Sequence, residues 1–383
     1  MVNRRPTRSR RTAASPPLRR KPTPTRQKSI PIRRNRNNLG ARKFKRPLTS
    51  PGSANYWRER AYTAGYLAAT AEDPPLTEEK SNPVENNLHH KVNARWHQWY
   101  QSVKRLPWPL YHAAAARFAE GYRKHAGGYF GNRLLVPTTK KVAAIVTVMN
   151  EKDTILSVIE QLHRLPLHEI IFIVNGSTDE TFEMIRNQSR AIIVHYRHAL
   201  GHDVGRAIGA KLSESEILLF LDGDFPVFAE HLVPFIDAIE RGVDIALNNI
   251  SPYIGLFSGR DDVTKVKEFI NRSMARADLE SNSLTAVPHA MRKQAAQLIG
   301  YANLAVPPKA QVIAIDKGLQ ISSPASVDVI TPNRLRARNV GQNNAVSELI
   351  IGDHIEALKT ALDLKGSRLS FADRIRQRPL TRH

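Results

Sequence analysis

A run of five apolar residues that ends in two aspartates constrains this chain more than any other feature of its sequence. The run extends from Ile217 to Leu221 and continues directly into Asp222, Gly223 and Asp224. Such a run predicts a β-strand that is buried on both faces, as in a parallel sheet covered by helices. In open α/β sheets, the carboxyl ends of the strands border the ligand-binding crevice. We therefore expect the two aspartates at a ligand site.

The two carboxylates also predict a metal ion. Neighbouring carboxylates repel one another unless a cation lies between them. Mg²⁺ and Mn²⁺ prefer oxygen ligands and are often held by one or two carboxylates together with substrate phosphates. Asp222 and Asp224 are thus the predicted metal ligands, and Gly223 lets the backbone approach a ligand closely. The alternative is a solvated turn, in which Asp and Gly are common.

Strands and helices alternate around this run. Apolar strands are predicted at residues 142–148, 169–174, 191–195 and 217–221, with helical segments at 154–165, 179–188 and 201–211. This alternation predicts an α/β fold with a mostly parallel sheet and right-handed crossovers. The loops that follow the strands then meet at one edge of the sheet. The polar residues expected at that edge are Asn150, Glu151, Asn175, Ser177, Asp222 and Asp224.

The composition excludes several classes of protein. The 383 residues include no cysteine, which excludes disulfides and cysteine-bound zinc. No segment has the roughly 18 to 20 consecutive apolar residues of a membrane span. No apolar stretch follows the basic N-terminus, as it would in a signal peptide. We expect a cytoplasmic protein without transmembrane segments, with peripheral attachment to the inner membrane face as an option.

Positive charge is concentrated at the N-terminus. Residues 1–46 contain 17 Lys and Arg residues, whereas the net charge of the whole chain is +22. The first acidic residue is Glu59. The Arg, Pro, Ser and Thr content of residues 1–52 predicts a disordered tail. Residues 1–46 can bind a polyanion, such as nucleic acid, or an anionic membrane surface. The alternative is a tail that only keeps the protein in solution.

Residues 53–130 predict a small helical accessory segment. Helices are expected from residue 53 to about 70, from 82 to 105 and from 111 to 125. In the second of these, apolar residues recur at spacings of three and four and form one stripe, which favours a role in packing over ligand binding. The stripe consists of Leu88, Val92, Trp96, Trp99 and Val103.

Three motifs in this order resemble the family 2 glycosyltransferases of the GT-A fold. They are Val-Thr-Val-Met-Asn-Glu at 146–151, Ile-Phe-Ile-Val-Asn-Gly-Ser-Thr-Asp-Glu-Thr at 171–181 and Leu-Phe-Leu-Asp-Gly-Asp at 219–224. The resemblance is strongest over residues 141–250 and implies a Rossmann-like GT-A domain at 138–383. Its nucleotide-sugar half would be 138–250 and its acceptor half 251–383. No Gly-x-Gly-x-x-Gly fingerprint of a dinucleotide site follows the first strand.

The resemblance also implies roles for single residues. Asp222 and Asp224 would hold Mn²⁺ or Mg²⁺, and this cation would neutralise the diphosphate of a departing nucleotide. Asp222 would also contact the ribose or the diphosphate. Arg206 is either a cation beside the diphosphate or a surface arginine. The expected residues for binding a nucleoside-diphosphate sugar are Thr147, Asn150, Glu151, Asn175, Ser177, Arg206 and Asp222.

Asn175 departs from the family pattern. Family members usually have two acidic residues, used at the nucleobase and ribose, where this chain has Val174 and Asn175. The loss of a carboxylate weakens a prediction of uracil recognition. The base is then a different one, or it is read by the backbone.

The acceptor half contains the candidate catalytic base. Helices are expected at 226–241, at 261–279 and from 288 onward, and strands at 243–248, 311–315 and 327–330. Residues 348–358 are similar to the Glu-Asp motif of inverting family members, whose carboxylate opens a helix and acts as a general base. The match falls on Asp353, although an Asp at a helix start is also an ordinary cap. The alternatives near the site are His202, Asp203, His289, His354 and Glu356.

The sequence thus predicts a metal-dependent glycosyltransferase that moves a sugar to an unspecified acceptor hydroxyl. If Asp353 is the base, the reaction inverts the anomeric centre. Residues 150–155 also resemble retaining glucosyl-phosphoglycerate synthases, so retention stays open. A nucleotidyltransferase is an alternative, but it would usually have a Gly-rich phosphate loop after the first strand. A third hypothesis is a degenerate GT-A domain that serves as a polyanion-tethered binding scaffold.

Overall fold

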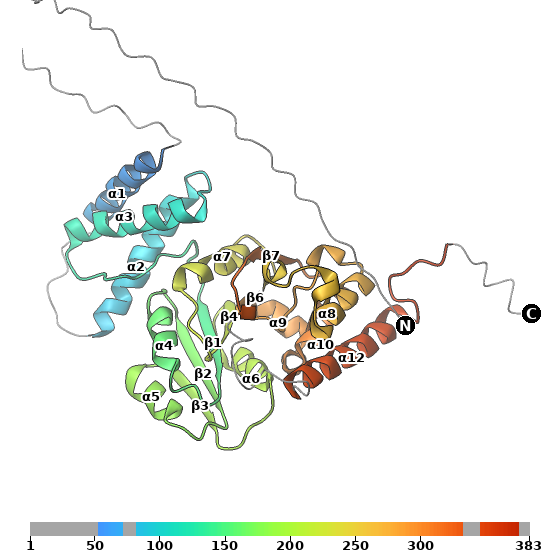
Figure 1. The fold of residues 1–383 in the computed structure, drawn as a ribbon. Helices are drawn as coiled ribbons and strands as arrows, with labels where there is room; N and C mark the ends of the chain where they lie inside the picture. The colour runs from blue at the N-terminus through green and yellow to red at the C-terminus, as the bar shows by residue number, and fades with distance from the viewer. Residues whose placement is uncertain (1–52, 72–81, 332–344, 375–383) are drawn as a thin grey trace, which may run out of the picture. The chain divides into compact units, whose positions relative to one another are not determined.

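A computed structural model describes residues 53–71, 82–331 and 345–374 (Figure 1). The tail predicted at residues 1–52 lies outside the described residues, so its disorder stays a prediction.

Seven strands in the described residues form one mixed sheet in the order β3-β2-β1-β4-β6-β5-β7. The parallel strands on one side are β1 (Val142–Val148), β2 (Glu169–Asn175), β3 (Ile192–Tyr196) and β4 (Ile217–Asp222). The remaining strands are β5 (Ile245–Asn248), β6 (His289–Arg292) and β7 (Ile321–Ala325). Because β6 runs antiparallel to both β4 and β5, β5 points in the same direction as β4. The carboxyl ends of β4 and β5 therefore lie at the same edge of the sheet.

The central strands are buried on both faces, as their continuous apolar runs predict. In β1, the side chains of Val142, Ala144 and Val146 belong to one hydrophobic core. Ala143 and Ile145 of the same strand belong to a second core. Successive side chains of a strand point to opposite faces, so one strand contributes to both cores. Polar side chains are accommodated only where these strands end.

Helices cover both faces of the sheet (Figure 1). The first core includes side chains of α4 (Ile155–His163), α5 (Thr181–Gln188) and α7 (Ala229–Glu240). The second core includes α6 (Val204–Leu212), α9 (Lys293–Ile299) and α10 (Pro307–Asp316). A third, smaller cluster joins α10 to α8 (Asp262–Ser273) and α12 (Ala345–Lys365). The short 3-10 helices are η1 (Ser251–Tyr253), η2 (Phe257–Gly259), η3 (Ala277–Leu279) and η4 (Tyr301–Ala305).

Three helices precede the sheet: α1 (Ala54–Thr70), α2 (Asn82–Gln101) and α3 (Trp108–Ala126). α1 and α3 touch through Gly65 and Gly121. A Cβ at either glycine would lie 2.0 Å from a backbone oxygen of the other helix, so neither position has room for a side chain. On α2, Trp96 is fully buried and its Nε1 donates a hydrogen bond to the hydroxyl of Tyr111 at 2.8 Å. The apolar stripe of α2 is therefore used for packing, as predicted.

These helices share the first hydrophobic core with the sheet. The side chain of Asn93 on α2 donates to the carbonyl of Thr138 at 2.8 Å and accepts from the amide of Val136 at 2.7 Å. Arg105 forms an ion pair of 3.1 Å with Asp237 on α7. The predicted accessory segment is thus held by apolar packing and by polar contacts to the chain around the sheet.

The acceptor half differs from the sequence prediction in three places. Residues 289–292 form strand β6 rather than the start of a helix, because they pair between β4 and β5. Residues 311–315 lie in helix α10, which begins at Pro307. Proline is favourable at the first position of a helix, and a short apolar run does not distinguish a buried helix from a buried strand. The last strand is predicted at 327–330, but in the structure it is β7, which lies earlier in the chain at Ile321–Ala325.

Candidate active site

Asp222 and Asp224 lie where β4 leaves the core. Asp222 is the last residue of the strand, and its side chain is 31% exposed. One carboxylate oxygen is 3.5 Å from the hydroxyl of Thr147 on β1, and the other is 3.6 Å from a guanidinium nitrogen of Arg206. Asp224 is half-buried in the loop that follows. Both carboxylates are thus at the carboxyl edge of the sheet, as the sequence predicts.

Gly223 fixes the loop that carries these aspartates. Its amide donates to the carbonyl of Thr147 at 2.9 Å. A Cβ at this position would lie 2.3 Å from Cγ1 of Val148, so no larger residue fits without a shift of β1 or β4. The hydroxyl of Thr154 donates to the carbonyl of Gly223 at 2.7 Å. The loop is therefore tied to β1 and to the start of α4.

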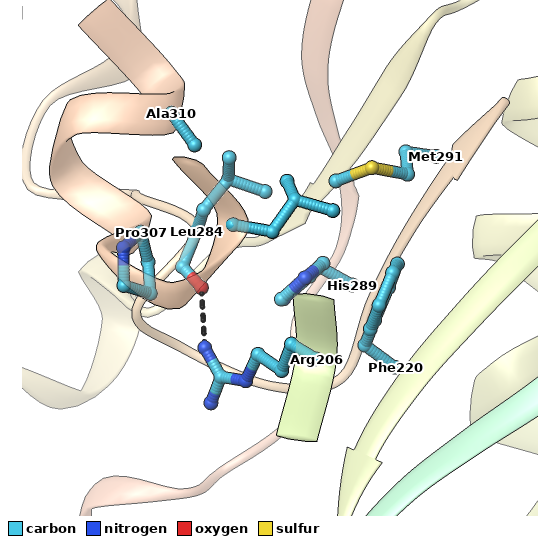
Figure 2. A pocket seen from close by; sticks show the side chains of 8 residues that line it. Arg206, Phe220, Leu284, His289, Met291, Pro307 and Ala310 are labelled. Atoms are coloured by element: carbon cyan, nitrogen blue, oxygen red, sulfur yellow. Dashed lines mark hydrogen bonds between the residues drawn. The ribbon is translucent and has the colours of Figure 1, made fainter. Parts of the chain in front are cut away.

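Arg206 lies in the first turn of α6 and is only 4% exposed, so it is not a surface arginine. Its Nη1 donates to the carbonyl of Leu284 at 2.9 Å (Figure 2). Its Nη2 is 3.0 Å from the carboxylate of Asp203 and 3.6 Å from that of Asp222. The guanidinium thus lies between two carboxylates and fixes the position of Asp222. Its burial excludes the surface arginine, and its role as a cation beside the diphosphate stays a prediction.

A small pocket borders Arg206 (Figure 2). Its volume of about 10 Å³ is near the minimum that holds one water molecule. His289 lines this pocket and stacks on Phe220, with ring centroids 4.9 Å apart. Burial lowers the pKa of His289 to about 3. His289 is therefore packed in the core, where burial favours its neutral form.

The loops after β1 and β2 bond to one another. Asn150 has a φ of 58°, a left-handed conformation that asparagine tolerates better than most residues. Its amide donates to the hydroxyl of Ser177 at 3.1 Å, and its side-chain oxygen accepts from the amide of Thr178 at 2.8 Å. The amide of Glu151 donates to the hydroxyl of Thr181 at 2.9 Å. The structure thus brings Asn150, Glu151 and Ser177 together beside the two aspartates.

Asn175 is used to hold the loop after β3. It ends β2 and is 6% exposed. Its side-chain nitrogen donates to the carbonyl of Gly201 at 2.9 Å, and its side-chain oxygen accepts from the amide of Leu200 at 2.7 Å. Both polar groups of the side chain are therefore bonded to the backbone of the chain itself. Sequence reasoning missed this role because the two partners lie 25 and 26 residues away.

Asp353 is the ninth residue of α12, so it does not open a helix. The prediction was wrong on this point, because the helix already begins at Ala345 and continues through Gly352. Asp353 is half-buried. Burial raises the pKa of its carboxyl, and the nearby carboxylates of Asp203 and Glu356 raise this pKa further. The raised pKa makes Asp353 a better proton acceptor than an ordinary aspartate.

The alternatives on α12 have structural roles. Nδ1 of His354 is 2.6 Å from the carbonyl oxygen of Ile350, and burial lowers the pKa of this histidine to about 4. Glu356 forms an ion pair of 2.7 Å with Lys309 on α10. The bond of His354 lies within α12, whereas Glu356 links α12 to α10.

The electrostatics near Arg206 also involve residues outside the predicted site. Asp203 precedes α6, is 8% exposed and has a φ of 61°. Burial raises the pKa of its carboxyl, an effect that Arg206 opposes. On α8, burial lowers the pKa of Lys267 to about 8, while the charges of Asp261 and Asp203 oppose this shift. Lys267 belongs to no sequence motif. Only the structure shows that α8 brings it close to the charges of Asp203, Arg206 and Asp261.

The sequence of this region matches the sequence model of the family described as "Glycosyl transferase family 2". The match covers residues 143–295, which extend from β1 to α9 and include the two aspartates of β4. Over residues 143–295 the chain is therefore similar to the family 2 glycosyltransferases, the family that the sequence motifs also resemble. The mixed, mostly parallel sheet of this region is the GT-A arrangement that the sequence predicts.

Solved structures that are similar to this chain include glucosyl-3-phosphoglycerate synthase from Mycobacterium tuberculosis. Its complex with uridine diphosphate is 16% identical in sequence and has a TM-score of 0.42, and the match covers 57% of this chain and 80% of that one. Its complex with Mn²⁺, uridine diphosphate and phosphoglyceric acid is also 16% identical, with a TM-score of 0.42, over 61% of this chain and 80% of that one. A search of curated proteins finds no match.

The carboxylate oxygens of Asp222 and Asp224 fit a site for Mg²⁺ or Mn²⁺. Within the described part of the chain, no three His, Cys, Asp or Glu side chains converge as a ready-made metal cage. Asp222 and Asp224 offer oxygen ligands alone. A sparse oxygen set of this kind suits Mg²⁺ or Mn²⁺ that is completed by substrate phosphates and water.

Proposed function

We propose that the protein transfers a sugar from a nucleoside-diphosphate sugar to an acceptor hydroxyl and uses Mn²⁺ or Mg²⁺ as its cofactor. The observation that carries the proposal is the position of Asp222 and Asp224 at the carboxyl edge of β4, within the region that is similar to the family 2 glycosyltransferases. Two carboxylates at such an edge can share a cation with the diphosphate of the donor.

Asp222 and Asp224 would hold the cation. When bound, this cation would supply positive charge that stabilises the diphosphate as it departs. Arg206 supports this arrangement because it is buried 3.6 Å from Asp222 and holds that carboxylate in one orientation. Asn150 and Glu151 in the loop after β1 and Ser177 in the loop after β2 would contact the nucleoside, and Thr147 bonds to Asp222.

Asp353 is the proposed general base. It would accept the proton of the acceptor hydroxyl as the acceptor oxygen bonds to the anomeric carbon and the bond to the diphosphate oxygen breaks. Attack from the face opposite the leaving group inverts the anomeric centre. The raised pKa of Asp353 supports this role, because a base works best when its pKa approaches the working pH.

Attachment to an anionic surface on the cytoplasmic side is part of the proposal. Residues 1–46 carry 17 positive charges and no acidic residue, a composition that favours binding to anionic lipid or another polyanion. Among the described helices, none combines the length and the apolar character needed to cross a bilayer.

The test is the release of nucleoside diphosphate from a panel of nucleotide sugars, with and without Mn²⁺. We expect release that requires Mn²⁺ and that Asp222→Asn or Asp224→Asn abolishes. The matched control is Asp262→Asn, because the side chain of Asp262 on α8 is 84% exposed. Release without a divalent ion, or unchanged release in both site variants, would contradict the proposal. Tight donor binding without any release or transfer would instead favour the binding scaffold.

A further inference from the structure

We propose that the turn between Gly255 and Gly259 inserts into the surface of an anionic membrane and thereby places the catalytic edge of the sheet against the bilayer. We call Leu256 and Phe257, the two apolar side chains of this turn, the apolar tip. The inference rests on the proposed function, because it assigns a location to the acceptor of that reaction.

The apolar tip is unusually exposed. Leu256 is 83% exposed, more than any other large apolar side chain in the described residues, and Phe257 beside it is 57% exposed. Single exposed apolar residues are common on proteins and need no explanation. Two adjacent ones at the end of a turn add apolar surface that water disfavours.

The turn holds the tip outward by specific bonds. Nε of Arg260 donates to the carbonyl of Gly255 at 3.1 Å, and its Nη1 forms an ion pair of 2.6 Å with Glu268 on α8. The amide of Arg260 donates to the carbonyl of Phe257 at 3.2 Å. The exposure of the tip is therefore a property of a bonded turn.

The base of the same loop is anchored in the protein. Ile250 and Ile254 are 1% and 6% exposed. The amide of Ile250 donates to the side chain of Asn282 at 2.8 Å. Of the apolar residues in this loop, the inner ones are buried and the outer pair is left in water, which is the arrangement expected of a docking element.

The topology places this loop at the catalytic edge. The loop follows β5, and β5 ends at Asn248 at the same edge of the sheet where β4 ends at Asp222. A surface that receives the tip would therefore meet the edge that carries the two aspartates.

Charge identifies the surface as an anionic lipid layer. A stretch with 17 Lys and Arg residues among residues 1–46 attracts anionic headgroups. Apolar side chains that enter the headgroup region, combined with basic residues, are the usual means of peripheral attachment. A nucleic acid would bind the basic residues but would not bury Leu256. An anionic membrane accounts for both the basic residues and the apolar tip.

The acceptor that fits this location is a hydroxyl group carried by a membrane lipid.

The first test is co-sedimentation of the full chain with phosphatidylcholine vesicles that contain or lack an anionic phospholipid. We expect the double variant Leu256→Ser/Phe257→Ser to bind anionic vesicles about tenfold or more weakly, since it removes two side chains that would be buried in lipid. The control Leu212→Ser/Tyr129→Ser changes a leucine and an aromatic residue that are 46% and 74% exposed elsewhere on the chain. It should bind like the wild type. Equal binding of the two double variants would overturn the proposal.

The second test uses the absence of cysteine from the chain. A polarity-sensitive dye on Leu256→Cys should shift to the blue with anionic vesicles and keep its spectrum with phosphatidylcholine alone, whereas the same dye on Leu212→Cys should not respond. No shift at position 256 would overturn insertion. A tip variant that loses transfer to a water-soluble acceptor without vesicles would also overturn it, because the tip would then belong to an acceptor site. Metal-dependent donor hydrolysis, measured separately, reports on the proposed function itself.

Discussion

At the scale of single residues, several side chains of the candidate site already form hydrogen bonds or ion pairs within the protein. Asn175 bonds to the backbone of Leu200 and Gly201, and Arg206 bonds to Asp203 and to the carbonyl of Leu284. Such bonds fix a site before any ligand arrives, which reduces the ordering needed on binding. They also predict which conservative substitutions fail.

Asn175→Asp restores the carboxylate that family members usually have and should destabilise the protein. A carboxylate cannot donate to the carbonyl of Gly201, so two acceptors would face each other in a buried position. We expect the free energy of unfolding to fall by about 1–3 kcal/mol, measured by urea denaturation. Asn187→Asp, at an exposed position on α5, is the control. An unchanged stability together with a new preference for uridine donors would show that the side chain reads the base.

The substitution Arg206→Lys keeps the positive charge but removes the planar guanidinium group, which can donate to several partners at once. Lysine cannot reach the carbonyl of Leu284 and the carboxylates of Asp203 and Asp222 together. We expect kcat/KM for metal-dependent donor hydrolysis to fall by about tenfold or more, which corresponds to about 1.4 kcal/mol of lost stabilisation. The control is Arg241→Lys, whose arginine is 44% exposed and pairs with Asp237. Full activity in Arg206→Lys would show that the guanidinium group is dispensable.

At the scale of elements, the approach of α6 to β1 positions the buried arginine. A Cβ on Gly205 would lie 2.2 Å from Cγ2 of Thr147, and a Cβ on Gly209 would lie 2.3 Å from Cγ2 of Ile145. The two glycines therefore let the helix lie directly on the strand. Arg206 follows Gly205 and reaches Asp222 because of this short distance.

Gly205→Ala should move α6 away from β1. We expect a loss of about 1–3 kcal/mol in the free energy of unfolding, the usual range for an overpacked contact, and a parallel loss of donor hydrolysis. Gly352→Ala is the control, because a Cβ on this helical glycine of α12 meets only open space. That variant should gain about 0.4–1 kcal/mol from the lower entropy of its unfolded chain. Equal stabilities of the two variants would contradict the close contact.

The position of Asp353 on α12 predicts a pH dependence. A general base must be ionised, so the rate of sugar transfer should fall as the pH decreases through a pKa above the usual value of about 3.9. Asp353→Asn should lose transfer but keep metal-dependent donor binding. Because the fold disfavours the ionised carboxylate, the Tm of this variant at neutral pH should be equal to or above that of the wild type. Transfer that persists in Asp353→Asn would assign the base to another residue.

At the scale of the whole molecule, buried histidines link stability to pH. Burial lowers the pKa of His89 to about 3, that of His289 to about 3 and that of His354 to about 4. In the unfolded chain these groups have a pKa of about 6.5. As the pH falls below 6.5, the unfolded state binds protons that the folded state does not, so the free energy of unfolding decreases.

The expected loss is on the order of 2 kcal/mol for each of these histidines between pH 6.5 and pH 5. Urea denaturation at pH 7.5 and pH 5.0 measures it. His354→Gln should show a smaller decrease than the wild type over this interval, because it lacks one of the three groups. A free energy of unfolding that is constant over this interval would show that the histidines are accessible to protons in the folded state.

The whole molecule also shows which features follow from sequence alone. β1 begins and ends at the predicted residues, and β4 extends the prediction by one residue, because continuous apolar runs identify strands with two buried faces. The short runs of the acceptor half did not distinguish β6 from a helix or α10 from a strand. The burial of Arg206 and the bonding of Asn175 depend on partners far along the chain, so no local pattern reveals them.

We propose that Asp222 and Asp224 bind a divalent cation together with a diphosphate. Calorimetric titration of the full chain with uridine and guanosine diphosphates, in the presence and absence of Mn²⁺, tests it most directly. We expect at least one of these two nucleotides to bind only when Mn²⁺ is present. This binding should disappear in Asp224→Asn and persist in Asp262→Asn. Equal binding without Mn²⁺, or undiminished binding in Asp224→Asn, would show that the two aspartates do not hold the cation and the diphosphate together.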